Sequence, residues 1–376
     1  MPGFEIIDKK EFLAVKKIFE EGGVLFAHGF DKLRKKYHVR EFEKENSKFF
    51  KSKYTLALTS GTAAIKVALK AIGVKPGDEV ITQAFNFIAT VEAILDVGAI
   101  PVIVNVDHNL NIDISEIKKK ITKKTKAIIP VHMLGHSCEI KKIVNICNKK
   151  IKIIEDNCES VGAKYNEAFL GTIGDIGIFS FDHGKILTTG EGGLLLTDKK
   201  KLFLTAKEYH DHGHKNVKNK PRGKDDVKFP GFNYRITELQ GAIGKVQLKK
   251  LPMILRENKK RYNIFKKILL NKVKFREEIK HTTSNYDTII FYEKNKERIK
   301  KIIKIINNNN FSTKNLPDAI KWHCSYYWKH IFKKSDINLM KPTLKLLKES
   351  IAIPILLKKD LKDYEKLANE IKKIYS

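Results

Sequence analysis

The chain has 376 residues, of which 42% are hydrophobic and 31% are charged, as expected for a globular protein with a sizeable core. No stretch approaches the ~20 apolar residues of a membrane helix, and residues 1–5 lack the basic, apolar character of a signal peptide. We therefore expect a cytoplasmic protein without membrane insertion. Four cysteines without a CxxC spacing predict reduced thiols and no metal site.

The formal net charge of +30 has two interpretations. Clustered lysine and arginine residues would indicate nucleic-acid binding, because they release counterions from phosphates. The basic runs, such as residues 118–120 and 372–373, are instead scattered, and there is no recognition-helix pattern. This scatter favours a compositional bias without a nucleic-acid partner. The charge can still attract an anionic substrate over a distance.

From about residue 54 to residue 200, short apolar runs alternate with helical patterns. We predict strands over residues 54–58, 79–82, 101–106, 126–131, 151–154, 176–181 and 193–197. Helices are expected over residues 63–72, 87–97, 114–121 and 139–148. Strands that are apolar on both faces, with helices between them, predict an α/β fold with a mostly parallel seven-stranded sheet and helices on both faces.

The second half of the chain is more polar. Residues 206–230 are expected to form a long loop, and helices are expected over residues 236–251 and 256–270. The remaining residues predict a small α+β domain at the C-terminal end. We therefore divide the chain into a large domain, residues 1–255, and a small domain, residues 256–376.

A serine and a glycine stand between the first predicted strand and the helix that follows it. Ser60 can cap this helix, Gly61 permits close approach of a ligand, and the first-turn N–H groups form an anion site. A plain helix cap would have the same sequence. The segment alone therefore predicts either a cap or a phosphate site.

Two further segments carry groups that suit catalysis. Glu155 and Asp156 end an apolar strand, where ligands of open α/β sheets lie, although a turn or cap explains them equally well. Lys185 lies between two strands among glycine and hydroxyl residues. A partly desolvated amine there would have a lowered pKa and could condense with an aldehyde, whereas a solvated loop lysine would not.

Together these segments resemble one family. The motif Ser-Gly-Thr-Ala-Ala from Ser60, the pair Glu155-Asp156, and the motif Ser-Phe-x-x-x-Lys-x-x-Thr-Thr-x-Glu-Gly-Gly around Lys185 resemble the DegT/DnrJ/EryC1/StrS sugar aminotransferases. A fourth family block matches residues 231–235, so the resemblance covers nearly the whole chain. It implies a fold-type I pyridoxal-phosphate transferase, with pyridoxal 5'-phosphate as cofactor.

The resemblance also implies roles for single residues. Lys185 would bind the cofactor aldehyde and move protons, and Asp156 would pair with the pyridinium nitrogen. Phe87 would stack on the ring, and Glu159 would lie near the ring oxygen.

The same resemblance implies a set of phosphate ligands. From one subunit they are Gly61, Thr62, Ala63 and Ser180. Asn233 would reach the phosphate held by the neighbouring subunit, which implies a homodimer with shared active sites.

Sugar dehydratases related to this family carry histidine in place of the lysine. His183 lies two positions before Lys185 and could suggest the same chemistry here. Counting forward from Ser180 and backward from residues 191–193 places the family position on Lys185. We therefore expect transamination.

A narrower similarity concerns the substrate. Residues 1–5, residues 209–214 and the segment around Trp322 look similar to the family's octulosonate transaminases. This similarity implies transfer from glutamate to the C8 aldehyde of 8-oxo-3-deoxy-D-manno-octulosonate for lipopolysaccharide. The alternative is a nucleotide-linked keto sugar. Candidates for substrate binding are His212, His214, Arg235 and His323, although a solvated turn or packing in the small domain would also explain the histidines.

Overall fold

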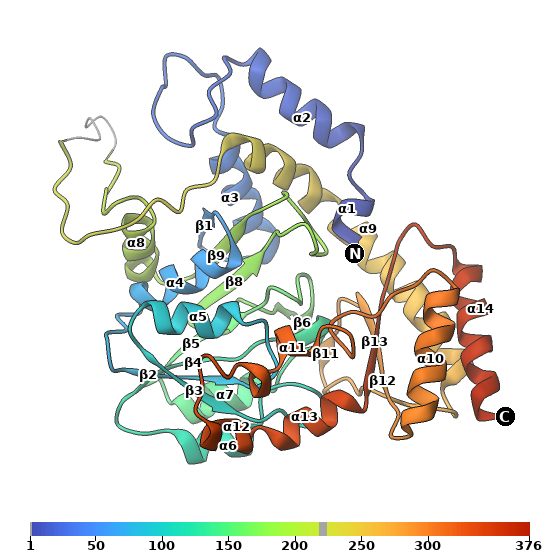
Figure 1. Cartoon of the computed structure of the whole chain (residues 1–376). Coiled ribbons are helices and arrows are strands. Elements are labelled where there is room, and N and C mark those ends of the chain that lie inside the picture. Colours follow the sequence, from blue (N-terminus) through green and yellow to red (C-terminus); the bar gives the residue numbers. More distant parts are fainter. Residues whose placement is uncertain (1, 218–223) are drawn as a thin grey trace.

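A seven-stranded sheet forms the centre of the computed structural model, which describes residues 2–217 and 224–376 (Figure 1). Its strand order is β1-β9-β8-β5-β4-β2-β3. The strands are β1 (Tyr54–Leu58), β2 (Glu79–Gln83), β3 (Ile100–Val104), β4 (Thr125–Ile129), β5 (Lys152–Asp156), β8 (Ile176–Ser180) and β9 (Gly193–Thr197). β9 is antiparallel to both neighbours, and the other pairs are parallel. The predicted α/β fold with a mostly parallel seven-stranded sheet is confirmed.

Helices cover both faces of this sheet, which explains why its strands are apolar on both sides. One core cluster joins the sheet to α4 (Gly61–Ala71), α5 (Ala89–Asp96) and α8 (Lys200–Tyr209). Other clusters join it to α3 (His38–Phe50), and to α6 (Ile114–Lys120) and α7 (Ile140–Cys147). The four helices predicted between strands are present, with bounds within two residues of the expectation.

The two helices predicted after residue 236 are a single helix, α9 (Glu238–Leu269). Pro252 lies inside it, on an exposed position where water can hydrate the carbonyl that loses its hydrogen bond. Leu251 and Ile254 pack in the large-domain core, whereas Phe265 packs in the small-domain core. Burial along both halves therefore outweighs the proline, and the boundary proposed at residue 255 falls within a continuous helix.

The loop predicted over residues 206–230 begins later than expected. Its first four residues complete α8, because Ala206 and Tyr209 are buried against the sheet and α4. Residues 218–223 of this segment lie outside the described residues.

The C-terminal part forms the predicted α+β unit. An antiparallel sheet of β10 (Lys274–Phe275), β12 (Thr288–Tyr292) and β13 (Ser350–Pro354) packs on the end of α9 and on α10 (Lys296–Asn308) and α14 (Leu361–Lys372). The segment from α11 (Ile320–His323) through α12 (Lys334–Leu339) to α13 (Lys341–Lys348) returns to the large domain (Figure 1). Thr343 donates a hydrogen bond to Asn105, with 2.7 Å between the oxygen atoms. This return brings small-domain residues close to the sheet.

Three smaller features complete the architecture. The N-terminal residues form α1 (Pro2–Glu5) and α2 (Lys9–Glu20). β11 (Thr282–Thr283) pairs with the hairpin of β6 (Lys164–Tyr165) and β7 (Ala168–Phe169). No helix within residues 2–217 or 224–376 is both long enough and apolar enough to cross a membrane.

The end of α9 offers a matched test of small-domain packing. Leu269 is fully buried, whereas its neighbour Leu270 is 56% exposed. Replacing Leu269 with alanine should lower the free energy of unfolding by about 2–5 kcal/mol, because it leaves a cavity. Leu270→Ala should change it by less than about 1 kcal/mol. Denaturant unfolding measures both values, and equal losses would contradict this packing.

Candidate active site

A cavity of about 630 Å³ lies beyond the carboxyl ends of β5 and β8, beside the start of α4. Asp156, Ser180 and Gly61 line it from the large domain, and Lys314 and Pro354 line it from the small domain. Small-ligand sites commonly have volumes of about 300–1,000 Å³ and occur between domains. The sheet edge and the returning C-terminal segment therefore enclose a space suited to a cofactor.

Most of the residues predicted for the cofactor meet in this cavity. Its lining includes Gly61, Thr62, Phe87, Asp156, Glu159, Ser180 and Lys185, together with His323, which was predicted for the substrate. The other predicted residues lie outside this lining; they are Ala63, His212, His214, Asn233 and Arg235. Their functional roles stay predictions.

The start of α4 presents N–H groups to the cavity. Ser60 caps the helix, and its Oγ accepts a hydrogen bond from the Ala63 N–H at 3.1 Å. This differs from the expectation for Ala63, because its N–H already has an acceptor. The N–H groups of Gly61 and Thr62 have none within the helix and can serve an anion. A Cβ atom on Gly61 would lie 3.0 Å from Ser180 Cβ, so glycine fits this close approach.

Asp156 is held in a fixed orientation at the end of β5. Thr90 Oγ1 donates a hydrogen bond to its Oδ2 at 3.0 Å, and the Cys158 N–H donates to its Oδ1 at 3.1 Å. The residue is 3% exposed and lines the cavity. Its neighbour Glu155 points away from the cavity, and its carboxylate accepts hydrogen bonds from the N–H groups of Gly171 and Ile173. Only the second carboxylate of the pair can therefore contact a ligand in this cavity.

Lys185 belongs to a chain of four charged groups. Its Nζ lies 2.9 Å from Glu159 Oε1, and the Nζ of Lys314 lies 3.8 Å from Glu159 Oε2. Lys314 also pairs with Asp287, at 2.7 Å. Positive and negative charges thus alternate from the large domain into the small domain.

This chain of charges sets the pKa values of its members. Burial alone would lower the pKa of the Lys185 ammonium group, but Glu159 outweighs burial and raises that pKa above its usual range. Burial alone would raise the pKa of Glu159, but Lys185 and Lys314 hold it well below its usual range. The expectation of a lowered lysine pKa from desolvation is therefore wrong for this chain, because an adjacent carboxylate stabilises the charged amine.

His323 and Phe87 form the aromatic side of the cavity. Their ring centroids lie 5.6 Å apart, and the Nδ1 of His323 contacts the Ala319 carbonyl oxygen at 2.9 Å. Burial lowers the pKa of His323, which favours a neutral imidazole. Phe87 is 46% exposed, so its ring is available to a planar ligand.

These groups fit pyridoxal phosphate. The α4 turn suits the phosphate, Asp156 suits a protonated ring nitrogen, and Lys185 suits an aldehyde. Glu159 supplies a further match, because its Oε2 is buried without a hydrogen-bond partner and can accept a bond from a ring hydroxyl. Each polar part of the cofactor has a counterpart in the cavity.

His183, the residue that could suggest dehydratase chemistry, does not line this cavity. Its ring stacks instead on Phe4, with ring centroids 5.1 Å apart and an interplanar angle of 17°. The geometry agrees with the motif count that selected Lys185.

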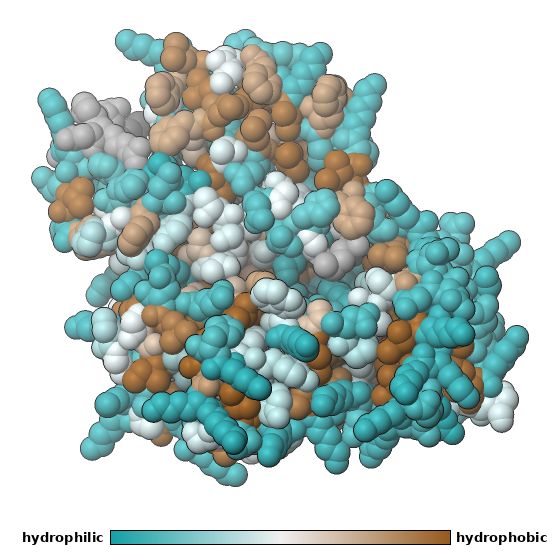
Figure 2. All heavy atoms as spheres, in the orientation of Figure 1, coloured by the Kyte–Doolittle hydropathy of each residue, from teal (hydrophilic) through white to brown (hydrophobic). Residues whose placement is uncertain are grey.

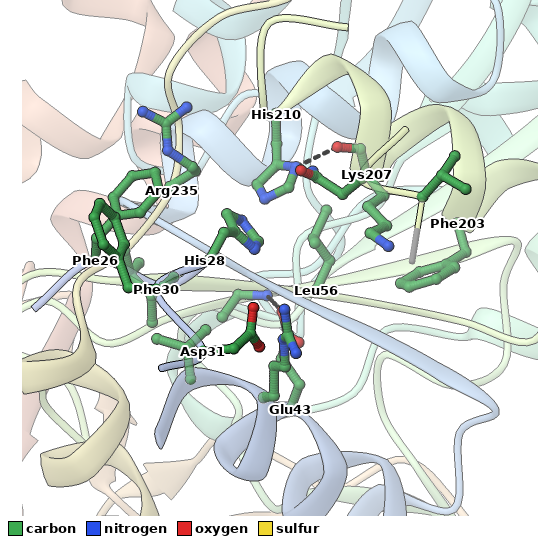
Figure 3. A pocket seen from close by; sticks show the side chains of 18 residues that line it. Phe26, His28, Phe30, Asp31, Glu43, Leu56, Phe203, Lys207, His210 and Arg235 are labelled. Atoms are coloured by element: carbon green, nitrogen blue, oxygen red, sulfur yellow. Dashed lines mark hydrogen bonds between the residues drawn. The ribbon is translucent and has the colours of Figure 1, made fainter. Parts of the chain in front are cut away.

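A second cavity, of about 1040 Å³, lies between residues 26–31, α3 and α8 (Figure 3). Arg235 lines it and donates a hydrogen bond to Asp211 at 2.5 Å. Burial raises the pKa of Glu43 to about 7 and lowers the pKa of His210 to about 4. Although larger, this cavity lacks Lys185 and Asp156, so we place the chemistry in the first one.

Sequence reasoning missed several residues of the Lys185 cavity. Thr90 orients Asp156 from 66 positions away, and Lys314 reaches Glu159 from the small domain. Lys314 follows Ser312 and Thr313 in a segment without a recognisable motif, so no local pattern distinguishes it from surface lysines. Only the three-dimensional fold reveals these contacts.

The fold and the cavity together define a fold-type I pyridoxal-phosphate transferase. Residues 24–372 match the DegT/DnrJ/EryC1/StrS aminotransferase family, and the chain belongs to this family. It is a pyridoxal-phosphate-dependent sugar transaminase by family, with pyridoxal 5'-phosphate as cofactor.

Individual relatives include several sugar enzymes. The chain is 35% identical over 251 residues to GDP-perosamine synthase of Escherichia coli O157:H7. The aligned region covers 66% of this chain and 68% of that protein. It is 34% identical over 283 residues to GDP-4-keto-6-deoxy-D-mannose 3-dehydratase of Yersinia pseudotuberculosis, with 69% of each chain covered. The solved structure of an aminotransferase from Psychrobacter cryohalolentis has a TM-score of 0.85 and 27% identity, covering 98% of this chain and 97% of that one.

The Lys185–Glu159 contact generates a pH prediction. Glu159→Gln removes the charge that raises the pKa of Lys185, so burial should dominate and the pKa should fall. The neutral amine should then appear at lower pH than in the wild type. Labelling of Lys185 by an acylating reagent across a pH series, followed by peptide mass mapping, measures this midpoint.

Glu167→Gln is the matched control, because the Glu167 side chain is 99% exposed. It should leave the Lys185 midpoint unchanged. A midpoint that stays fixed or rises in Glu159→Gln would contradict the assigned role of Glu159.

Proposed function

We propose that this enzyme transfers the amino group of glutamate to the C8 aldehyde of 8-oxo-3-deoxy-D-manno-octulosonate, in the cytoplasm, for lipopolysaccharide biosynthesis. The main support for amino transfer is the position of Lys185 in one cavity with Asp156 and Glu159. Support for this sugar comes from a sequence similarity to octulosonate transaminases. The similar segments are residues 1–5, the loop at residues 209–214 and the segment around Trp322. The proposal corresponds to an 8-amino-3,8-dideoxy-D-manno-octulosonate transaminase.

The cavity contains a cation that suits an acidic substrate. Lys314 is 8% exposed and lines the cavity from the small domain. Within the described residues, the lining holds no arginine, so Lys185 and Lys314 are its fixed positive charges. Once Lys185 is engaged with the cofactor, Lys314 is the group that can attract a carboxylate. Both glutamate and a free sugar acid carry one.

Different residues of the cavity would have different roles in transamination. Pyridoxal phosphate supplies an aldehyde that condenses with amines and a ring that withdraws electrons. The Nζ of Lys185 would take up and release the proton of the donor's α-carbon. Asp156 would keep a proton on the facing ring nitrogen, and Glu159 would stabilise the charged form of Lys185. Phe87 would hold the ring plane and exclude water from one face.

A nucleotide-linked keto sugar is the second candidate substrate. It is favoured by the similarity to GDP-perosamine synthase, whose product is named as a GDP-sugar. A sugar dehydratase is a weaker alternative, favoured by the Yersinia pseudotuberculosis relative. Against it stands Lys185, which lines the cavity where His183 does not.

We also propose a homodimer with shared active sites. The N-terminal residues expose large apolar side chains, which are Phe4, Ile7, Phe12, Leu13, Phe19, Leu25, Phe30 and Leu33. Figure 2 shows apolar atoms gathered over the region of α2. Contiguous apolar surface of this kind is typical of protein interfaces. Asn233 is exposed outside the Lys185 cavity, as a residue that serves a second subunit would be.

A panel of acceptors tests the substrate. Purified protein is incubated with pyridoxal phosphate, glutamate and each of three acceptors: the octulosonate aldehyde, a GDP-4-keto sugar and a UDP-4-keto sugar. We expect the aminated octulosonate by mass spectrometry, at least tenfold faster than the other products. Lys185→Ala should abolish the product, because its proton carrier and cofactor anchor are lost. A GDP-linked amino sugar as the main product would replace the proposal by the second candidate.

Subunit mixing tests the shared sites. Lys185→Ala and Asn233→Ala proteins should each be nearly inactive alone. After dissociation and reassociation together, the mixed dimers should regain activity, because one of their two sites carries neither substitution. The wild type taken through the same treatment is the control. If the mixture stays as inactive as its components, or if Asn233→Ala is fully active, sites are not shared through Asn233.

A further inference from the structure

The first residues of the chain lie directly against the loop that carries Lys185. The Gly3 N–H donates a hydrogen bond to the Lys185 carbonyl oxygen at 2.9 Å. The Phe4 ring stacks on the ring of His183, in the same loop. Residues more than 170 positions apart therefore meet within two residues of the reactive amine.

Gly3 fits this contact because it has no side chain. A Cβ atom there would lie 2.3 Å from the Lys185 carbonyl oxygen and 3.2 Å from Thr188 Cβ. Such distances leave no space for any other residue without movement of the loop backbone. The close approach explains a glycine at this position by packing.

The same segment also contacts the small domain. Glu5 accepts a hydrogen bond from the Leu357 N–H at 2.8 Å, just after β13. Ile6 and Leu357 pack against the core cluster that contains Ile186 and Leu187. The N-terminal residues therefore join the lysine loop to the domain that supplies Lys314 and His323 to the cavity.

A second connection runs through α9. Gln247 donates a hydrogen bond to buried Glu11 of α2 at 2.8 Å and accepts one from the Thr188 N–H at 3.4 Å. Lys250 pairs with Glu11 at 2.7 Å and donates to the Ile6 carbonyl oxygen at 2.5 Å. The residues that follow the contact with the lysine loop are thus anchored to the small domain through Glu5 and to α9 through Ile6 and Glu11.

We propose that residues 3–5 are positioning residues, which clamp the Lys185 loop against the small domain and so fix the amine relative to the cofactor. Residues 3–5 are not among the residues that line the Lys185 cavity. Their effect passes through the backbone of residues 182–188. Since catalytic groups must be held within fractions of an ångström, such a clamp controls how well the amine meets an aldehyde. The inference concerns cofactor attachment and does not depend on which sugar or donor the enzyme uses.

The test compares Gly3→Ala and Phe4→Ala with the wild type and with Phe4→Tyr, which keeps the stacked ring. Loss of one such contact should weaken binding of pyridoxal phosphate about fivefold, as expected for an interaction of about 1 kcal/mol. Amide hydrogen exchange in residues 182–188 should speed up, while exchange in β8 stays unchanged. The pH at which the visible absorbance of the bound cofactor changes should also shift. Phe4→Tyr should keep the wild-type cofactor affinity, the wild-type amide exchange and the wild-type pH of the absorbance change.

Two results would overturn the proposal. The first is wild-type cofactor affinity, absorbance and exchange in both Gly3→Ala and Phe4→Ala. The second is faster exchange spread equally over β8 and α4, which would show general destabilisation without a specific effect on the lysine loop. All these measurements use the protein with cofactor alone, so an error in the proposed substrate would not alter them.

Discussion

The ion pair between Lys185 and Glu159 is the interaction on which the site depends. Both groups lie inside the cavity, where an uncompensated charge would be costly, and each one stabilises the charged form of the other. Lys314 and Asp287 extend the pair into the small domain. The amine is therefore held in place by charges from both domains.

The large-domain sheet explains how these groups come together. Parallel strands end at one edge, so the ends of β5 and β8 place Asp156 and Ser180 beside the first turn of α4. The C-terminal segment then crosses back from the small domain with Lys314 and His323. Because one continuous helix, α9, packs in both cores, the two domains share a rigid element. The position of the cavity follows from this topology.

Much of the fold could be predicted because its signals are local. The seven apolar strands and the helices between them carry clear periodicity, and Lys185 and Asp156 lie in motifs with fixed spacing. The predictions were wrong where contacts between residues far apart in the sequence determine the local structure or the pKa. Two helices were expected over residues 236–251 and 256–270, but packing in both cores keeps α9 whole in spite of Pro252. Desolvation suggested a lowered pKa for Lys185, but the ionic contact with Glu159 depends on tertiary structure. Thr90 and Lys314 had no sequence signal for the same reason.

The proposed function requires Lys185 to be the amine that attaches the cofactor. Borohydride reduction of the protein with bound pyridoxal phosphate, followed by protease digestion and mass mapping, tests it directly. We expect the phosphopyridoxyl group on the peptide containing Lys185 and its absence from Lys185→Ala protein. Attachment to another lysine, Lys314 included, or equal attachment in Lys185→Ala, would contradict it.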